Sequence, residues 1–529
     1  MISYKKYHRN TRNTRNTRNT INTRNNRRKT ISTSRRRGGL AEIKHVKNGE
    51  MQINQNSKNN DGWIRITIRG GPYDRGFAHG ELAAHLFPHV FRVLSFMSKE
   101  GYGRDIDFLY EICNDFFEPI IQKRFPKIYQ EMKGIADGAK LRLCQVILIN
   151  MYMSLPYFYS HMLRYIDTPK YRKKYADVIR DEYAISANPA SLASRNAKLN
   201  EYKDRCSLIM AVGSDWTKNG DIVCGHSSFS NFLDAQFCNI ILRIEPETGD
   251  GHTIVMQSAA GGVFSMTDFF VTSAGIIGSE TTIGNFNAFE LRDPICCRIR
   301  ECMQYGNTLD DYAERLQKGN SGDYACSWMF GDIHHKKIMR VELGLNYVNI
   351  ETTKNGVFVG FNSTYDERIR NIECSHSLSS SVNDATSIGN VDSGDNSLGF
   401  RNITSSIGNR RVQLEKLAEK YRGKIDTSIA MKILSDHYDN HLGKINANTR
   451  TVCKHDYSDK DAASPFKPVG AYDCKVVDSA LAAKMTFLAR WGPPCGTSFF
   501  VKQHITKHPE WKDWEEYLVD MPKRPWVEV

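Results

Sequence analysis

The sequence changes character at Cys206, and this change constrains the fold more than any other feature. Residues 165–205 are polar and poor in large apolar side chains, so we predict an exposed insert or linker there. From Cys206 onward, short apolar segments of strand length are separated by turn residues such as Asn219 and Gly220. The predicted strands cover residues 206–212, 221–227, 239–244, 253–257, 269–282, 325–332, 338–343, 347–351 and 357–361.

Helical periodicity occupies other parts of the chain. Residues 78–97 carry apolar side chains at helical spacing, and Pro88 is expected to kink or split that helix. Further helices are predicted within residues 116–137 and at 293–305, 308–317, 410–421 and 427–437. Runs of strands with the helices set apart predict an α+β fold, in which packed sheets are covered by helices, and not alternating parallel βαβ units.

The positive charge of the chain is confined to its beginning. The 529 residues carry a net charge of +13, but residues 1–60 contain 16 Lys and Arg against two Glu, a net of +14. The rest is therefore nearly neutral, and its charge gives no support for a nucleic-acid-binding enzyme. The repeated Asn-Thr-Arg text of residues 10–27 has almost nothing apolar to bury, so we predict a disordered basic tail. A transit peptide, a polyanion-binding segment and a dispensable extension all fit such a tail.

These patterns divide the chain into three parts. Residues 1–60 are the tail, residues 61–205 are a helical N-terminal segment that ends in the insert at about 165–205, and residues 206–529 are the strand-rich region. We expect no membrane span, because no apolar run reaches 18 residues, and no secretory signal, because the N-terminus lacks an apolar core. The patterns fix neither the compartment nor the oligomeric state.

Several kinds of site have no support in the sequence. There is no GxGxxG after a predicted strand and no Walker loop, so nucleotide chemistry is not indicated. The chain has 13 cysteines, but none of them form a CxxC pair, so neither a zinc ribbon nor a thioredoxin motif is indicated. We therefore predict no metal and no cofactor.

Cys206 begins a predicted strand directly after the polar insert. Cleavage between Arg205 and Cys206 would make Cys206 N-terminal and place a free α-amine on the same residue as the thiol. The pKa of such an amine, about 7.7–8.0, suits a general base near neutral pH. The alternative is a buried, inert strand cysteine, which is the commoner situation.

The strand-rich region resembles the phospholipase B-like family. The resemblance is carried by blocks in a fixed order, which span most of residues 206–500: Cys206-Ser207-Leu208-Ile209, Val223-Cys224-Gly225-His226-Ser227-Ser228-Phe229, Thr267-Asp268-Phe269-Phe270, Ser279-Glu280-Thr281-Thr282-Ile283-Gly284-Asn285, Asn320-Ser321-Gly322-Asp323-Tyr324, Trp328-Met329, Gly360-Phe361-Asn362, Tyr472-Asp473-Cys474-Lys475-Val476 and Gly492-Pro493-Pro494.

The N-terminal segment is similar to a second family, the acyl-coenzyme A:6-aminopenicillanic acid acyltransferases. The matching text is Tyr73-Asp74-Arg75-Gly76, His79-Gly80, Phe125-Pro126-Lys127 and Glu131-Met132-Lys133-Gly134-Ile135-Ala136-Asp137-Gly138-Ala139. Both resemblances imply an N-terminal-nucleophile hydrolase with an αββα sandwich and an autoprocessed precursor. They imply a catalytic αββα region at 206–529, with Cys206 as the nucleophile, but different substrates.

The first resemblance implies roles for further residues. His226 matches a histidine near the nucleophile, Phe229 a pocket wall where that family usually has tryptophan, and Thr281 a pocket threonine. Asn362 matches an asparagine whose side-chain amide would donate to the developing oxyanion. Either Arg410 or Arg411 aligns with an arginine of the site; we choose Arg411, because Val412-Gln413 follows it, as a group that binds a substrate carboxylate or phosphate.

The implied function is hydrolysis of an acyl bond, an amide or an ester, in a lipid-like or N-acyl substrate. Two alternatives remain open. One is an acyltransferase or peptide amidase of the penicillin acyltransferase type, which has the same chemistry. The other is a non-catalytic binding protein on a hydrolase fold, which the departures at residues 227–229 from the family's usual text favour. The family's members are typically lysosomal or secreted, but without an evident signal we do not carry that location over.

Overall fold

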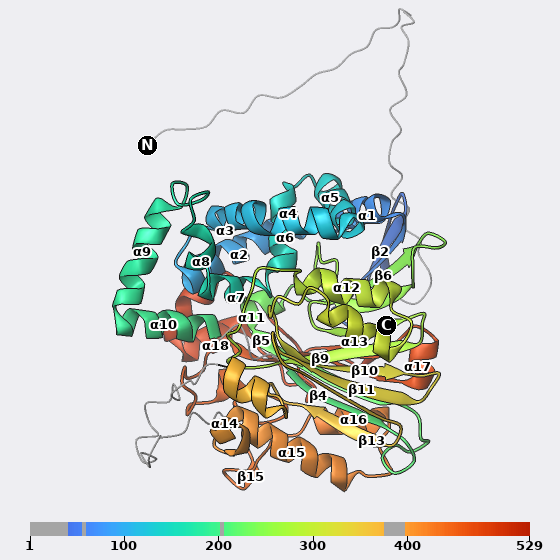
Figure 1. Cartoon of the computed structure of the whole chain (residues 1–529). Coiled ribbons are helices and arrows are strands. Elements are labelled where there is room, and N and C mark those ends of the chain that lie inside the picture. The colour runs from blue at the N-terminus through green and yellow to red at the C-terminus, as the bar shows by residue number, and fades with distance from the viewer. Residues whose placement is uncertain (1–40, 55–59, 201–205, 375–396) are drawn as a thin grey trace, which may run out of the picture.

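The computed structural model describes residues 41–54, 60–200, 206–374 and 397–529 (Figure 1). Two sheets form its centre. The strands of the larger sheet are, in spatial order, β1 (Ala41–Val46), β2 (Gly49–Asn54), β3 (Ile64–Gly70), β6 (Ile240–Pro246), β7 (Ile254–Ser258), β8 (Phe269–Thr272), β9 (Ile276–Thr282), β10 (Cys326–Asp332), β11 (Lys337–Leu343) and β12 (Val348–Thr353). Those of the smaller sheet are β13 (Gly356–Gly360), β4 (Cys206–Val212), β5 (Val223–Asn231), β16 (Val469–Asp478), β17 (Leu488–Trp491) and β18 (Val527–Glu528).

Helices cover the outer faces of both sheets. Between the sheets, β4 packs on β9 and β11; on the outside, α15 and α16 lie on the smaller sheet and α13 lies on the larger one (Figure 1). The helices that follow Cys206 in the chain are α11 (Phe232–Ala235), α12 (Ile295–Tyr305), α13 (Leu309–Gln317), α14 (Ser397–Arg401), α15 (Ser406–Lys420), α16 (Thr427–Leu434), α17 (Ser479–Ala483) and α18 (Val501–Lys507). The expected α+β class with its helix–sheet–sheet–helix layering is confirmed.

The layering follows from the alternation of side chains along β4. Leu208, Met210 and Val212 belong to the main core between the sheets, whereas Ile209 and Ala211 pack with α15 and α16. Both faces of this strand are thus buried, which explains why its sequence is almost continuously apolar.

The N-terminal segment is helical, as predicted. Its helices are α1 (Pro72–Ala83), α2 (Phe87–Tyr102), α3 (Ile106–Ile112), α4 (Glu118–Arg124), α5 (Pro126–Ala139), α6 (Leu143–Met151), α7 (Leu155–Ser160), α8 (Leu163–Ile166), α9 (Ala176–Ala187) and α10 (Pro189–Asn200). The helix predicted over residues 78–97 is divided into α1 and α2, with Pro88 in the first turn of α2. The remaining elements are the π-helices η1 (Cys113–Phe117) and η2 (Ile369–Glu373), the 3₁₀ helices η3 (Asp456–Ser458) and η4 (Pro509–Trp514), and the strand pair β14 (Tyr438–Asp439) and β15 (Lys444–Ile445).

Two expectations about the N-terminal half need correction. The tail predicted over residues 1–60 includes β1 and β2, which form a hairpin at the edge of the larger sheet, because Asn48 adopts the positive φ of a tight turn and Met51 and Ile53 face apolar neighbours. Only residues 1–40 and 55–59 of that range lie outside the described residues. The insert predicted at about 165–205 is helical where the structure describes it, up to Asn200, since it forms α9 and α10, which run beside the other N-terminal helices (Figure 1).

The N-terminal segment is part of the central fold and not a separate body. Its strand β3 pairs in parallel with β6, from Ile64 opposite Ile240 to Gly70 opposite Pro246. Together with β1 and β2, the part of the chain before Cys206 therefore supplies three strands of the larger sheet. Among the helices of the described ranges, none combines the length and the apolar content that crossing a bilayer requires.

Candidate functional site

Cys206 is the first residue of β4 and its side chain is 2% exposed. It lies opposite Ser228 of β5 in the smaller sheet. Its backbone N–H donates to Asn362 Oδ1 at 3.3 Å, and its Sγ lies 4.0 Å from Glu280 Oε1 at the end of β9. Burial, together with the negative charges of Glu280 and Asp268, raises the pKa of the thiol well above its usual range. In the uncut chain the thiol is therefore protonated at neutral pH.

Arg410 holds the other side of Cys206. The guanidinium comes from the second turn of α15, a helix that begins at the Ser405 cap, whose hydroxyl accepts from the Gly408 N–H. The Arg410 Nη1 donates to the Cys206 carbonyl at 2.8 Å, and the Arg410 Nη2 donates to Asn362 Oδ1 at 2.9 Å. The guanidinium also lies 5.0 Å from the centre of the Phe229 ring, a cation–π contact.

Arg411 does not contribute to this site, so our choice of Arg411 over Arg410 is corrected. Successive helical residues point about 100° apart, and only Arg410 faces the smaller sheet. Arg411 donates to the Phe400 carbonyl at 3.0 Å and forms an ion pair with Glu415 at 2.8 Å, one turn along the same helix. It is therefore engaged away from Cys206.

Asn362 faces Cys206 with its oxygen and not with its amide group. Oδ1 accepts from Cys206 N–H and from Arg410, while Nδ2 donates to the Thr282 carbonyl at 2.9 Å. This orientation is fixed by the partners, because a guanidinium only donates and a carbonyl only accepts. In this state the expected oxyanion donor is thus committed to Thr282, and Asn362 instead positions the nitrogen of Cys206.

A buried acidic pair lies beside the thiol. The Tyr324 hydroxyl lies 2.8 Å from Asp268 Oδ2 and 3.0 Å from Glu280 Oε1, and all three side chains are almost fully buried. Burial and the neighbouring Glu280 raise the pKa of the Asp268 carboxyl well above its usual range. This shift favours a protonated Asp268 carboxyl beside Glu280.

A buried cation faces the same region. Lys475 of β16 is completely buried, and its Nζ donates to Asp473 Oδ1 at 2.5 Å and to Ser228 Oγ at 2.8 Å. Ser228 is the cross-strand partner of Cys206, so Lys475 is hydrogen-bonded to the residue that lies directly beside Cys206 in the sheet. Its charge acts to lower the pKa values of both Cys206 and His226.

His226 is buried two residues along β5 from Ser228. Its Nε2 donates to the Glu280 carbonyl at 3.1 Å, and it makes this contact rather than one with Cys206. Burial, and after it the Lys475 charge, lowers its pKa well below the usual range, so the imidazole is neutral at physiological pH. This arrangement suits a residue that orients Glu280 better than a direct proton carrier for the thiol.

The remaining predicted residues divide into three situations. Phe229 is buried and forms a wall between Arg410 and Lys454, whose charged groups both lie over its ring. Thr281 is buried beside Gly360, and its hydroxyl has no hydrogen-bond partner among the described residues. Arg205, on the other side of the predicted cleavage, lies outside the described residues.

Comparisons with known proteins show a similarity to one family over part of the chain. The sequence model of the Phospholipase B family matches residues 127–353, a stretch that contains Cys206, His226, Phe229 and Thr281. The chain is similar to the phospholipase B family over this stretch. Asn362 and Arg410 lie beyond the matched stretch, as does the first part of the N-terminal text that resembles the acyltransferases.

The individual relatives of this family are distant. A phospholipase B from Crotalus adamanteus is 25% identical over 334 residues, which are 57% of this chain and 54% of that protein. Phospholipase-B 81 from Drysdalia coronoides is 27% identical over 266 residues, 47% of this chain and 45% of that protein. The chain thus spans about half the length of the curated relatives it matches. Among solved structures, a mutant of the conjugated bile acid hydrolase from Clostridium perfringens aligns with 54% of this chain and 89% of its own at 11% identity and a TM-score of 0.29.

Several residues of the site were present in the family-like text but had no role assigned from sequence. Glu280, Asp268, Tyr324, Lys475 and Asp473 all stand inside blocks that carried the resemblance. A charged residue inside a predicted buried strand is itself a signal, since burying an unpaired charge is costly. What the sequence does not supply is that these strands converge on Cys206.

Proposed function

We propose that this chain is an autoprocessed hydrolase of acyl bonds whose nucleophile is Cys206. One observation carries the proposal: the nitrogen, the carbonyl and the thiol of this one residue face three different buried polar side chains, Asn362, Arg410 and Glu280. A cysteine that only fills a core needs none of them. Buried charges are costly unless paired, and such groups gather at active sites. The match to the phospholipase B family supports the same conclusion.

The first reaction is cleavage of the chain by itself. The Cys206 sulfur attacks the carbonyl carbon of Arg205, so a C–S bond forms and the peptide C–N bond breaks. The thiol proton passes through Glu280 to the departing Cys206 nitrogen. Water then attacks the thioester, which releases Arg205 as a carboxylic acid and regenerates the thiol on a new N-terminal cysteine.

In each later turnover the α-amine of Cys206 is the general base. Its ordinary pKa, about 7.7–8.0, allows it to take the thiol proton and return it to the leaving group. Asn362 Oδ1 accepts a hydrogen bond from the Cys206 nitrogen, and this bond orients the lone pair of the nitrogen toward the sulfur. The unpartnered Thr281 hydroxyl is the group that we assign to the developing oxyanion, in place of the Asn362 amide.

The substrate class follows from the chemistry and from the relatives' names. The relatives are phospholipases B, which favours the ester of an acylated phospholipid. A thiol with a preassembled amine base also suits an N-acyl amide, and transfer to an added amine uses the same acyl-enzyme. We therefore propose an acyl substrate of lipid-like character. Release of the acyl group to water, rather than its transfer, defines the hydrolase.

The test is acyl release by full-length protein from two matched substrates, a diacyl phospholipid and an N-acyl amino acid of the same chain length. We expect fatty acid to appear with one or both, and Cys206→Ala to lower the rate by at least about a thousandfold. Cys144→Ala, which changes a thiol in the first turn of α6, is the matched control and keeps the activity.

Two results would contradict the proposal. Equal rates in Cys206→Ala and the unchanged protein would remove Cys206 from the chemistry. Absence of acyl release from either substrate by processed protein, with or without an amine acceptor, would favour the binding-protein alternative.

A further inference from the structure

A second group of reactive side chains lies outside the Cys206 site. His437 follows α16, Cys453 and His455 lie on the loop after β15, and Cys495 lies on the loop after β17. Their ligand atoms, two imidazole nitrogens and two sulfurs, all lie within 4.8 Å of one another. No step proposed above uses any of these residues.

The spacing is that of ligands around one metal ion. His455 Nε2 lies 3.1 Å from His437 Nε2, 3.2 Å from Cys453 Sγ and 3.5 Å from Cys495 Sγ. In a tetrahedral zinc site, with bonds of about 2.0–2.1 Å to nitrogen and about 2.3 Å to sulfur, neighbouring ligand atoms are about 3.3–3.8 Å apart. Two imidazoles and two thiols also suit zinc, whereas magnesium and calcium prefer oxygen ligands.

Outer contacts prepare the ligands for a metal. The Nδ1 of His455 lies 2.8 Å from the Tyr457 hydroxyl, so a hydrogen bond there leaves the Nε2 lone pair directed into the group. Cys495 Sγ lies 3.1 Å from the Thr497 hydroxyl, which donates to a thiolate.

We propose that His437, Cys453, His455 and Cys495 bind one Zn²⁺ ion in a closed tetrahedral site. Four protein ligands leave no position for water or substrate, so the ion is structural. It joins three separate parts of the chain: the end of α16, the loop after β15 and the loop after β17.

The ligand-bearing loop also packs against the nucleophile strand. The Val452 carbonyl, next to Cys453, accepts from Ser207 Oγ at 3.1 Å, and the Lys454 carbonyl accepts from the Ala471 N–H of β16 at 2.9 Å. A metal at this place therefore stabilises the segment that packs against Ser207. Its role is to hold the position of that segment, not to take part in the reaction.

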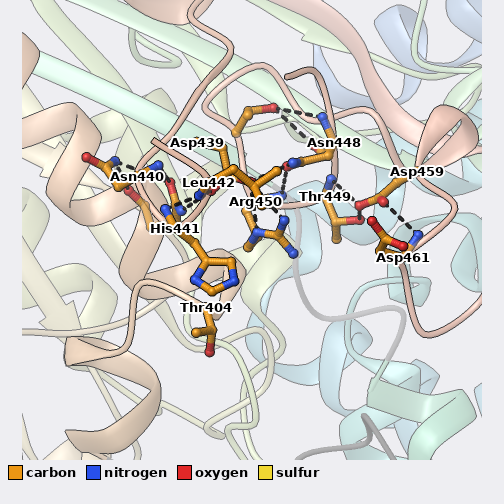
Figure 2. A network of polar contacts seen from close by, with 12 residues as sticks. Thr404, Asp439, Asn440, His441, Leu442, Asn448, Thr449, Arg450, Asp459 and Asp461 are labelled. Carbon is orange, nitrogen blue, oxygen red and sulfur yellow. Dashed lines mark hydrogen bonds and ion pairs between the residues drawn. The ribbon is translucent and has the colours of Figure 1, made fainter. Parts of the chain in front are cut away.

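A network of polar contacts ties the same loop to α15. The buried Asp439 carboxylate accepts hydrogen bonds from Asn448 at 2.7 Å and from Arg450 at 2.8 Å. These residues are drawn in Figure 2. The other oxygen of Asp439 accepts from Asn409, the residue before Arg410. The proposed zinc and this network thus hold neighbouring parts of the loop after β15.

Sequence spacing alone did not reveal this site, and our expectation of no metal rested on the absence of a CxxC pair. The ligands are spread over residues 437–495, and only Cys453 and His455 are close in sequence. Folding, and not a local motif, brings them together.

The test is the metal content of full-length protein purified without chelators, measured by inductively coupled plasma mass spectrometry. We expect about one zinc per chain in the unchanged protein and in the control Cys144→Ser. Cys495→Ser and His437→Gln weaken zinc binding by at least about tenfold. A chain that stays free of zinc after incubation with excess Zn²⁺ would overturn the proposal.

A second measurement avoids variants that fail to fold. Alkylation of the unchanged protein, read by peptide mass spectrometry, should find Cys453 and Cys495 protected in the zinc-loaded form and modified after a chelator is added. Replacement with Co²⁺ should give the visible absorption of a tetrahedral thiolate site. A Cys453–Cys495 disulfide in freshly purified, unreduced protein, or identical alkylation with and without chelator, would contradict the inference. Neither readout depends on activity, so both stand apart from the proposed function.

Discussion

At the scale of single residues, the geometry separates two neighbouring arginines. Arg410 donates to the Cys206 carbonyl and to Asn362, whereas Arg411 pairs with Glu415. Hydrogen bonds from a charged donor contribute about 1.5–3 kcal/mol each. We therefore expect Arg410→Gln to slow the appearance of the fragment that begins at Cys206 by roughly tenfold to a hundredfold.

Arg411→Gln is the matched control, because it removes the same charge from the next residue of the helix. Its processing rate, followed by gel densitometry, should equal that of the unchanged protein. If both variants slow equally, the effect belongs to the charge of α15 and the assigned contact is wrong. Arg410→Lys, which keeps the charge but not the two-pronged geometry, should recover only part of the rate.

His79 provides a prediction about pH. This histidine of α1 is fully buried, its Nε2 accepts from the Gly261 N–H at 3.1 Å, and burial lowers its pKa to about 4. Unfolding frees the imidazole to titrate at about 6.5, so between these values the unfolded chain binds the extra proton. Stability from this group is therefore complete above pH about 6.5 and is lost as the pH falls toward 4, by up to about 3 kcal/mol.

Urea unfolding at pH 7 and pH 4.5 measures this loss. His79→Gln keeps an acceptor for Gly261 but does not titrate, so its stability should fall less than that of the unchanged protein over this range. An equal fall in both proteins would show that His79 is not a source of the acid sensitivity.

Residue roles could be predicted from sequence only in part. Cys206 and Phe229 were selected from the sequence by their resemblance to the family, and in the structure both contact Arg410. Arg411 was chosen over Arg410 because of the residues that follow it. The sequence does not show which of two neighbouring helical residues faces the sheet. The Asn362 orientation was missed because it depends on which partners surround the amide.

At the scale of elements, the packing of α1 on α5 explains the sequence motifs of these two helices that resemble the acyltransferases. Gly76, Gly80, Gly134 and Gly138 lie where the two helices meet, and a Cβ added at any of them would stand within about 2.2 Å of a backbone oxygen of the other helix. The buried Arg75 and Glu131 of the same text form an ion pair at 2.6 Å across this contact. These residues thus support the fold and do not approach Cys206.

Gly134→Ala tests this packing. The new Cβ would lie 2.2 Å from the Tyr73 carbonyl oxygen, so the helices must separate, and overpacking of this kind costs about 1–3 kcal/mol or more. We expect a clear fall in the midpoint of urea unfolding. Gly399→Ala is the control, because an added Cβ there meets nothing within 4 Å and Ala favours the helix; a fall of the same size there would contradict the packing account.

Secondary structure was easier to predict than its boundaries. The strands from residue 206 to 361 were found because buried strands have a simple apolar pattern. The hairpin of β1 and β2 was missed because its apolar residues alternate with polar ones next to the basic tail. Its stability comes from the pairing of β2 with β3, which the local sequence does not show. The single strand expected over 269–282 is two strands, β8 and β9, joined at Gly275, which adopts a positive φ.

At the scale of the whole molecule, the larger sheet combines strands from both sides of the proposed cleavage. β3 pairs with β6 along its full length, and Arg75 of the N-terminal segment pairs with Asp250 at 2.8 Å. Glu131 of that segment also forms a buried ion pair with Arg300 at 2.9 Å. Separation of the two fragments would break this sheet and expose their shared core.

We therefore expect the two fragments of processed protein to remain one particle. They should elute together from a gel-filtration column in native buffer and separate only in denaturant. Two separately eluting, folded fragments in native buffer would contradict this view of the N-terminal segment as part of the central fold.

The central claim is that Cys206 becomes the N-terminal nucleophile, and intact mass with N-terminal sequencing of the purified chain tests it most directly. After incubation at mildly acidic and neutral pH, the account predicts a fragment that begins Cys-Ser-Leu-Ile in the unchanged protein and a single uncut chain in Cys206→Ala. A fragment with another N-terminus, or the same cut in Cys206→Ala, would contradict it.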